Sequence, residues 1–299
     1  PATSLRHAPR HHSLGVREES RPGASIRDCR SDLAADRYLS AEKICDASVV
    51  TAPSQFYTGL VAELYASLRS ADPDVETCAR FVTRKGTPAL ELGCGDGDPL
   101  LELRRRALDV EGLDSSADML DRCRQRAAAL NLDVTLHHAE IENMDLGRRF
   151  RSIFLAGATF NLIVDDATAG RALERIAAHL EPGGAALIPL FVPPPVPAAD
   201  IGRVSERIVE GGHTLRCTTI AVQRRETERL QTATLRYERV ENDGERSTID
   251  RDWTLHWYTP PLFAELVAAA GLRPLRVVDA DGAPARAEST AFAFIVAPA

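Results

Sequence analysis

Apolar residues in the N-terminal third of the chain recur at helical spacing. Between Gln55 and Arg69 an apolar side chain stands at every fourth position from Phe56 to Leu68, which predicts one helix with a single apolar face. A second helix is predicted from Val75 to Thr83, and the Gly and Pro residues that follow it end the helix. The two helices are expected to belong to a cap, assigned to residues 33–86.

The pattern changes at about residue 87 to short apolar runs separated by amphipathic segments. The runs PALELG, DVEGL, DVTLHH, RSIFLAG and AALIPLFV predict five buried strands, and the segments between most of them have helical periodicity. This alternation of strands and helices is typical of a parallel sheet that is covered by helices on both faces.

After the Pro-rich segment PLFVPPPVP the apolar period becomes two. The segments TLRCTTIAVQR, LQTATLRYERV and STIDRDWTLHWY predict an antiparallel insertion, with a hairpin turn at Asn242-Asp243-Gly244. A helix in TPPLFAELVAAAG and two further strands complete the core. The expected fold is α/β: a doubly wound, mostly parallel, seven-stranded, Rossmann-like sheet over residues 87–299, which carries an antiparallel lid insertion at 200–258.

Composition, charge and cysteine spacing limit the kinds of partner that the protein is expected to bind. The hydrophobic fraction of 44% is ordinary for a globular protein, and the formal net charge of -7 argues against a nucleic-acid partner. The six cysteines have no metal-binding spacing, so we expect no metal site and a cytoplasmic protein, and no apolar run is long enough to imply a membrane partner. Residues 1–32 are rich in Pro, Gly, Ser, Arg and His and are predicted to be a mobile tail. The sequence is compatible with a homodimer but does not determine the oligomeric state.

The segment ALELGCGDGD is the strongest local signal of a ligand site. Gly93, Gly95 and Gly97 follow a predicted strand and precede a helix, where glycine permits a tight turn and the close approach of a ligand. Asp114 ends the next strand roughly 20 residues further on, as expected for a carboxylate that binds the two hydroxyls of a ribose. A structural turn and a helix cap are the alternative interpretations of these residues.

The spacing of these glycines favours S-adenosylmethionine (SAM) over a dinucleotide. A pyrophosphate is bound by G-x-G-x-x-G at a helix N-terminus, whereas Asp96 and Asp98 crowd the turn in this chain. Their carboxylates would repel a diphosphate but tolerate a cationic ligand. Glu91, inside the preceding strand, is likewise better matched to an amino group than to a phosphate.

These motifs resemble, in content and order, the class I SAM-dependent methyltransferase family from about Phe56 to Ala299. ELGCGDGD is similar to the first motif of the family, GLDSSADML to the second and HHAEIENMDL to the third; YTPPLFAELVAAAGLRPLRVVD resembles the last helix and strand of its small-molecule branch, which includes amino-sugar N-methyltransferases and glycine N-methyltransferase. The resemblance implies that SAM is the cofactor. The cofactor-binding residues that it implies are Tyr57, Glu91, Gly93, Cys94, Gly95, Asp114, Ser115, Met119, Glu140, Ile141 and Ala156.

The family resemblance further implies in-line methyl transfer to a nitrogen or oxygen atom of a small-molecule acceptor, of the secondary-metabolite kind. His256 is the candidate general base because the insertion that carries it is expected to fold over the cofactor. A core histidine whose nitrogens are satisfied is the alternative interpretation. Tyr65 is the second candidate catalytic residue, and the expected acceptor wall consists of Phe160, Asn161, Trp257 and Tyr258.

Two other functions are compatible with the same sequence. The chain could be a non-catalytic or regulatory subunit that binds SAM, or an enzyme of the same fold that uses SAM without transferring its methyl group. Asp165 and Asp166 precede a helix and are expected to cap it rather than to bind a metal ion.

Overall fold

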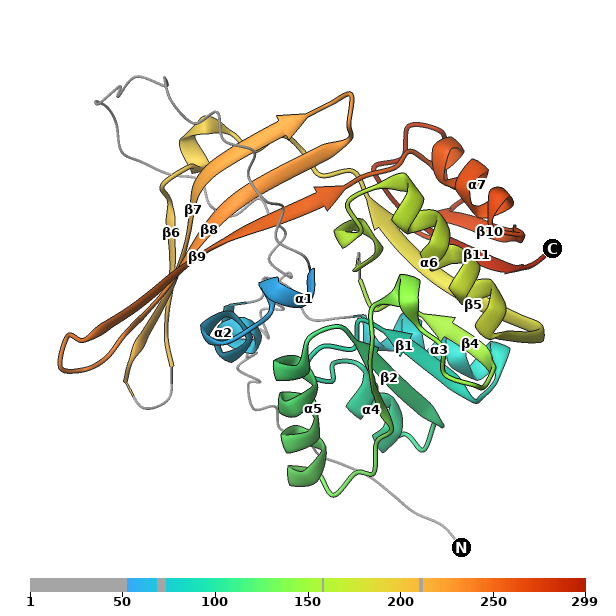
Figure 1. Ribbon diagram of the computed structural model, residues 1–299, viewed down its shortest axis with the longest axis horizontal. Helices are drawn as coiled ribbons and strands as arrows, with labels where there is room; N and C mark the ends of the chain where they lie inside the picture. The colour runs from blue at the N-terminus through green and yellow to red at the C-terminus, as the bar shows by residue number, and fades with distance from the viewer. Residues whose placement is uncertain (1–52, 69–73, 158, 210–211) are drawn as a thin grey trace, which may run out of the picture. The chain divides into compact units, whose positions relative to one another are not determined.

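Seven strands of the computed structural model form one sheet in the order β10-β11-β5-β4-β1-β2-β3 (Figure 1). The structure describes residues 53–68, 74–157, 159–209 and 212–299, which belong to one compact unit. The strands of this sheet are β1 (Ala89–Leu92), β2 (Val110–Asp114), β3 (Leu136–His138), β4 (Phe150–Phe154), β5 (Leu180–Phe191), β10 (Leu272–Asp279) and β11 (Ala291–Pro298). The expected tail at 1–32 and the first part of the expected cap, up to residue 52, lie outside the described residues.

Strands β1 to β5 pair in parallel, and β11 lies antiparallel between β5 and β10. The strand order reverses between β1 and β4, because the chain runs from β1 outward to β3 and then crosses back to β4. A crevice opens outside the carboxyl ends of the strands at such a reversal, and ligands of doubly wound folds bind there. The predicted fold class is confirmed.

Two hydrophobic clusters cover the two faces of the sheet. Alternate residues of each strand point to opposite faces, so that Leu90 belongs to one cluster and its neighbour Ala89 to the other. The first cluster is covered by α6 (Asp166–His179) and α7 (Pro260–Ala269), and the second by α3 (Val75–Lys85), α4 (Leu100–Arg105) and α5 (Ala117–Ala129). Single turns of 3-10 helix follow three of the strands: η1 (Ile141–Asn143), η2 (Thr159–Leu162) and η3 (Ala198–Asp200).

The single helix predicted between Gln55 and Arg69 is instead two helices, α1 (Pro53–Phe56) and α2 (Leu60–Leu68). The chain breaks because Gly59 adopts a φ of +54°, in the left-handed region, and its amide donates to the carboxylate of Asp118 at 2.6 Å. A tertiary hydrogen bond therefore overrides the helical pattern. The same hydrogen bond joins the cap to the start of α5.

A second sheet carries the residues of the predicted insertion. It contains β6 (Val204–Ile208), β7 (Thr214–Arg225), β8 (Leu230–Val240) and β9 (Arg246–His256), all antiparallel in this order. We refer to it as the lid sheet. The sequence predicted three of its strands and missed β6, because every residue of β6 is exposed and the strand lacks an apolar face.

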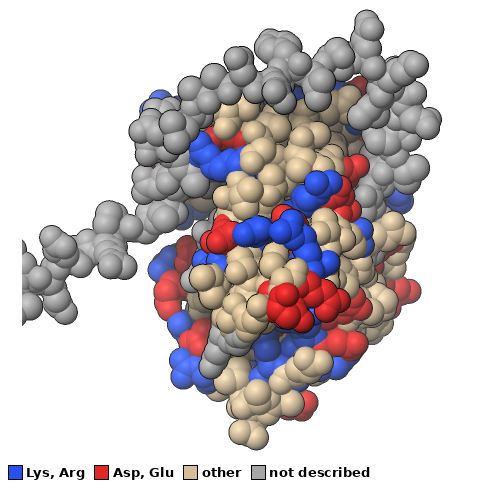
Figure 2. Space-filling model, turned by 90° about the vertical axis from the view of Figure 1, so that its left-hand side faces the viewer, with Lys and Arg blue, Asp and Glu red and all other residues tan. Residues whose placement is uncertain are grey.

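Charged side chains of both signs intermingle on the side of the molecule that the lid sheet forms (Figure 2). Arg216 pairs with Glu206 at 2.6 Å, for example, and Arg236 pairs with Asp250 at 2.8 Å. This face is therefore not a basic patch. None of the helices within the described ranges is both long and apolar enough to cross a bilayer.

Candidate functional site

A cavity of about 310 Å³ opens at the carboxyl ends of strands β1 to β4. Its volume is at the lower end of the range for small-molecule sites, which is roughly 300–1,000 Å³. The cap, the turns after the four strands and the start of α6 supply its walls. The lining residues are Tyr57, Tyr65, Gly93, Gly95, Leu113, Asp114, Ser115, Met119, Ala139, Glu140, Ile141, Glu142, Thr159, Leu162, Ile163, Val164, Asp165 and Thr168.

The turn after β1 approaches the loop after β4 so closely that only glycine fits. Gly93 has a φ of +71°, and a Cβ atom at this position would lie 2.5 Å from the Cγ2 atom of Thr159. Gly95 has a φ of +53° and would meet Met119 at 3.3 Å. Both residues line the cavity, so the backbone itself forms part of the wall and leaves room for a ligand.

Asp114 connects the turns after β1 and β2. One carboxylate oxygen accepts a hydrogen bond from the amide of Gly95 and the other accepts one from the amide of Ser116, each at 2.8 Å. Burial raises the pKa of Asp114, while these amide hydrogen bonds oppose the shift. The helix cap is Ser116, whose hydroxyl accepts from Met119, so capping does not occupy Asp114.

The cap closes the cavity on the side of α5. The hydroxyl of Ser116 donates to the carbonyl oxygen of Tyr57 at 2.6 Å, and the rings of Tyr57 and Tyr65 meet edge to face with centres 5.4 Å apart. Burial, with Tyr65 as a second cause, raises the pKa of Tyr57 above its usual range. Tyr57 therefore contributes an uncharged ring and hydroxyl to the wall.

Three carboxyl groups line the cavity between η1 and α6. Asp165 caps α6: its two oxygens accept from the amide and the hydroxyl of Thr168, both at 2.8 Å. Burial alone would raise the pKa of Asp165, but these hydrogen bonds outweigh it and keep the pKa below its usual value. Burial raises the pKa of Glu142, and the negative charge of Glu140 adds to the shift. The same wall thus offers one carboxylate held ionised and one that binds a proton more readily.

The structure brings many of the candidate residues together at this cavity. Nine of those named from the sequence line it: Tyr57, Tyr65, Gly93, Gly95, Asp114, Ser115, Met119, Glu140 and Ile141. Eight lining residues that follow β3 and β4 were not singled out from the sequence as site residues: Ala139, Glu142, Thr159, Leu162, Ile163, Val164, Asp165 and Thr168. The position of these segments after buried parallel strands is the signal that could have found them, as it found Asp114.

Glu91, Cys94 and Ala156 do not line the cavity. Glu91, in β1, and Cys94, within the glycine turn itself, are both buried, and the thiol of Cys94 packs against Gly112 of β2. The carboxyl group of Glu91 is buried, and burial raises its pKa well above the usual range. Ala156 packs against the cluster on the face of α3 to α5.

The four residues expected to form an acceptor wall lie behind the cavity rather than in it. Phe160 packs edge to face on Phe263, with ring centres 5.2 Å apart. Asn161 donates to the carbonyl oxygens of Phe191 and His256 at 3.0 and 2.7 Å. Trp257 is 5% exposed and lies beneath the guanidinium of Arg224. Tyr258 is buried in the core cluster.

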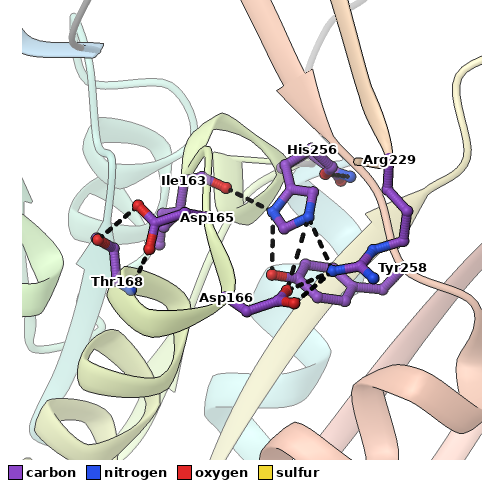
Figure 3. A network of polar contacts seen from close by, with 8 residues as sticks. Ile163, Asp165, Asp166, Thr168, Arg229, His256 and Tyr258 are labelled. Carbon is purple, nitrogen blue, oxygen red and sulfur yellow. Dashed lines mark hydrogen bonds and ion pairs between the residues drawn. The ribbon is translucent and has the colours of Figure 1, made fainter. Parts of the chain in front are cut away.

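His256 lies beside Tyr258, also outside the cavity lining. It is 2% exposed, and both of its ring nitrogens have polar neighbours (Figure 3). Burial lowers the pKa of His256, and the charge of Arg229 lowers it further. The neutral form of the imidazole is therefore favoured.

Residues 89–184 match the family model described as a methyltransferase domain. This range runs from β1 into β5 and includes the glycine turn and Asp114. It also includes Glu140, Glu142 and Asp165, which together we call the acidic wall of the cavity. Among relatives, the dTDP-3-amino-3,6-dideoxy-alpha-D-glucopyranose N,N-dimethyltransferase of Streptomyces fradiae is 32% identical over 149 residues, which are 47% of this chain and 57% of the relative. The chain thus spans little more than half the length of that relative.

Solved structures match over most of the chain. The methyltransferase CcbJ of Streptomyces caelestis has a TM-score of 0.64 at 22% identity, covering 84% of this chain and 98% of that one. A sugar N-methyltransferase of a Streptoalloteichus species has a TM-score of 0.60 at 20% identity, covering 87% and 99%. At such identities these matches establish the fold.

Proposed function

Because residues 89–184 form a methyltransferase domain of the class I SAM-dependent fold, we propose that the chain transfers a methyl group from SAM to an amine nitrogen of a small-molecule acceptor. One observation carries the proposal. A single cavity contains the glycine turn and Asp114 in one part of its wall, and the carboxyl groups of Glu142 and Asp165 in another.

The first part of the wall fits the cofactor. Asp114 retains lone pairs on both oxygens for two ribose hydroxyls, and its contact with Gly95 fixes its orientation. The missing Cβ atoms at the glycine turn leave space for the amino-acid part of SAM. The proposed cofactor residues in the lining are Tyr57, Gly93, Gly95, Asp114, Ser115, Met119, Glu140 and Ile141. We propose that Glu91, Cys94 and Ala156, which do not line the cavity, support these lining residues from the protein interior.

The second part of the wall fits an amine acceptor that becomes cationic as it is methylated. Carboxylates attract an amine and stabilise the positive charge that its nitrogen gains as it bonds to the methyl carbon and the electron pair of the old bond passes to sulfur. Glu142, whose pKa is raised, is suited to receive the proton that the nitrogen then loses. Asp165, held ionised by Thr168, supplies a fixed negative charge.

The names of the relatives support nitrogen as the acceptor atom, since the Streptomyces fradiae protein is named for an amino sugar and N,N-dimethylation. For this chain we propose an amine of similar secondary-metabolite type. Tyr65 lines the cavity, and we propose that its hydroxyl orients the acceptor. Phe160, Asn161, Trp257 and Tyr258 would support the acceptor wall from behind. A direct role of His256 as base stays a prediction.

Acceptor pairs that differ only in an amine or a hydroxyl group test the acceptor class. The full chain is incubated with SAM and each member of a pair, including dTDP-3-amino-3,6-dideoxyglucose and its 3-hydroxy counterpart, and S-adenosylhomocysteine is quantified. The proposal expects turnover with amines and at least about tenfold less with the hydroxyl counterparts, since the site's charged groups are then left unpaired. Preferential turnover of hydroxyl acceptors would contradict it.

A further inference from the structure

Arg229 stands in an unusual backbone conformation at the point where the lid sheet meets the core. It precedes β8 with a φ of +57°, although it is not a glycine. Its amide donates to the carbonyl of Glu226 at 3.1 Å, and its own carbonyl accepts from the amide of Trp257 at 3.0 Å. The turn between β7 and β8 is therefore attached to the end of β9, and the Arg229 side chain reaches the first residue of α6.

Four side chains from three segments form a closed polar network at this place (Figure 3). Arg229 donates to both carboxylate oxygens of Asp166 at 2.6 Å and lies 3.2 Å from Nε2 of His256. The hydroxyl of Tyr258 lies 3.1 Å from Nδ1 of His256, and Nε2 of the same ring lies 3.6 Å from an oxygen of Asp166. We call Asp166, Arg229, His256 and Tyr258 the Arg229 network.

The donors and acceptors of this network fix the state of the imidazole. A guanidinium can only donate, so a hydrogen bond between Arg229 and Nε2 of His256 requires Nε2 to accept and Nδ1 to carry the hydrogen. Nδ1 then donates toward the Tyr258 hydroxyl, with the carbonyl oxygen of Ile163 at 3.3 Å as a second acceptor. The lone pair that a general base would use is already bound to Arg229.

Protonation of His256 would break this arrangement. A hydrogen on Nε2 would face the guanidinium at 3.2 Å, nearer than the Asp166 oxygen at 3.6 Å. This agrees with the direction of the pKa shift: burial lowers the pKa of His256, and Arg229 lowers it further. The charged and titratable groups that face the imidazole are Arg229 from the lid sheet, Tyr258 beyond β9, and Asp165 and Asp166 at the start of α6. The two aspartates partly oppose the shift.

The network lies directly behind one wall of the cavity. None of its four members lines the cavity, but Ile163, whose carbonyl faces His256, and Asp165, the neighbour of Asp166, both do. Asn161, which belongs to η2, donates to the carbonyl of His256 at 2.7 Å. The lining segment 162–165 is therefore held from behind by the lid sheet.

We infer that Arg229, His256 and Tyr258 are positioning residues, which hold segment 162–165 and the Asp165 carboxylate in place at the acceptor part of the cavity. This inference rests on the proposed function for the identity of the acceptor part, but not for the network itself. It gives the lid sheet a role in shaping the site without placing any of its side chains against the reacting atoms.

The test compares Arg229→Gln with Arg229→Lys, which keeps the charge, and with Arg246→Gln. Arg246 belongs to the same sheet and also pairs with a carboxylate, but this pair lies at the far end of β8 and β9. Imidazole NMR of the full chain should show the Nδ1–H tautomer of His256 and a pKa below the usual value in the wild type. In Arg229→Gln the pKa should rise and the tautomer preference should weaken, with partial recovery in Arg229→Lys.

Hydrogen exchange of peptides that cover residues 160–168, measured with SAM present, reports on the wall. We expect exchange at least about tenfold faster in Arg229→Gln, unchanged exchange in Arg246→Gln, and SAM affinity within about twofold of wild type in both, because local opening reports local stability. Unchanged exchange at 160–168, or a His256 that titrates as in the wild type, would overturn the inference. If SAM fails to bind the wild type, the proposed function fails, while both readouts still test the network in the free protein.

Discussion

The carboxylate of Asp114 accepts a hydrogen bond from the amide of Gly95 at 2.8 Å, which ties the end of β2 to the turn after β1. These two residues are 19 positions apart in the chain and both line the cavity. The contact fixes the geometry of the glycine turn and orients the carboxylate. A site arranged before binding loses less entropy when the ligand arrives.

Asp114→Ala should weaken SAM binding about 10- to 100-fold. The substitution removes the proposed ribose contacts and the brace on Gly95, and hydrogen bonds to charged groups contribute about 1.5–3 kcal/mol each. Calorimetric titration of folded protein with SAM measures the change. Asp121→Ala on the exposed face of α5, which removes only a surface ion pair, is the matched control. Equal SAM affinity of Asp114→Ala and the control would refute the role of Asp114.

Gly93→Ala should lower both the free energy of unfolding and SAM affinity. The new methyl group would lie 2.5 Å from Thr159, and the left-handed backbone alone disfavours alanine by about 1–2 kcal/mol. Gly170→Ala is the control, since this helical glycine has nothing within 4 Å of a Cβ atom and alanine should stabilise the helix by about 0.5–1 kcal/mol. Urea unfolding and SAM titration give the two quantities. A Gly93→Ala protein as stable as Gly170→Ala would show that the turn is not constrained.

Much of the fold could be predicted from the sequence because its determinants are local. The apolar runs give the parallel strands, and the glycine run and Asp114 give the turns that form one part of the cavity. The break at Gly59 could not be predicted, since it depends on a hydrogen bond to Asp118, 59 residues further along the chain. For the same reason, the sequence could not separate the residues that line the cavity from those behind it.

His256 illustrates this limit. Its neighbours Trp257 and Tyr258 indicate an apolar wall, but the sequence does not show that Arg229, 27 positions earlier, occupies one ring nitrogen. Asp165 differs from the sequence prediction in the opposite direction. It was expected only to cap a helix, which it does, and the same carboxylate also lines the cavity. A cap and a ligand contact look alike in sequence because both require a carboxylate at the end of a strand or the start of a helix.

Glu142→Gln and Asp165→Asn should each raise the KM for an amine acceptor about tenfold or more, with SAM affinity little changed. The amides keep the shape of the side chains, and asparagine can still cap α6, so the main loss is negative charge beside the amine. Steady-state kinetics with any amine that the wild type methylates provide the measurement. Glu174→Gln on the exposed face of α6 serves as control. An unchanged acceptor KM in both variants would remove these carboxyl groups from the acceptor site.

Glu91→Gln should flatten the pH dependence of stability. Burial raises the pKa of Glu91, and Asp114 raises it further, so above the ordinary value near 4.5 the folded protein keeps a proton that the unfolded chain has lost. The free energy of unfolding of the wild type should therefore fall as pH rises through this range, and part of the slope should vanish in the variant. Urea titrations from about pH 5 to about pH 8 measure it.

Glu102→Gln provides the comparison for that slope. Hydrogen bonds from Arg105 and Arg106 hold the pKa of Glu102 near 2, so its contribution to stability is lost only at lower pH. Its replacement should leave the slope above about pH 5 intact. The interpretation of Glu91 is wrong if both variants retain the full slope of the wild type.

His256→Ala distinguishes a positioning residue from a general base. Loss of a base lowers kcat by about 10²- to 10⁴-fold and removes the limb of the pH profile near the imidazole pKa. If His256 acts through the Arg229 network, kcat per folded molecule should fall less than about tenfold, while the acceptor KM rises and SAM affinity is retained. Steady-state kinetics normalised to folded protein, across pH, provide the measurement. A loss confined to kcat, together with the missing limb, would restore the direct role.

The central claim is that this cavity supports methyl transfer from SAM to nitrogen. The most direct measurement follows a methyl-¹³C label from SAM by NMR and mass spectrometry while the full chain reacts with an amine acceptor. We predict that the label appears on the amine nitrogen in an amount equal to the S-adenosylhomocysteine released, and that Asp114→Ala slows both together. SAM that binds in the cavity without S-adenosylhomocysteine being released with any amine, or a label recovered on oxygen, would contradict the account.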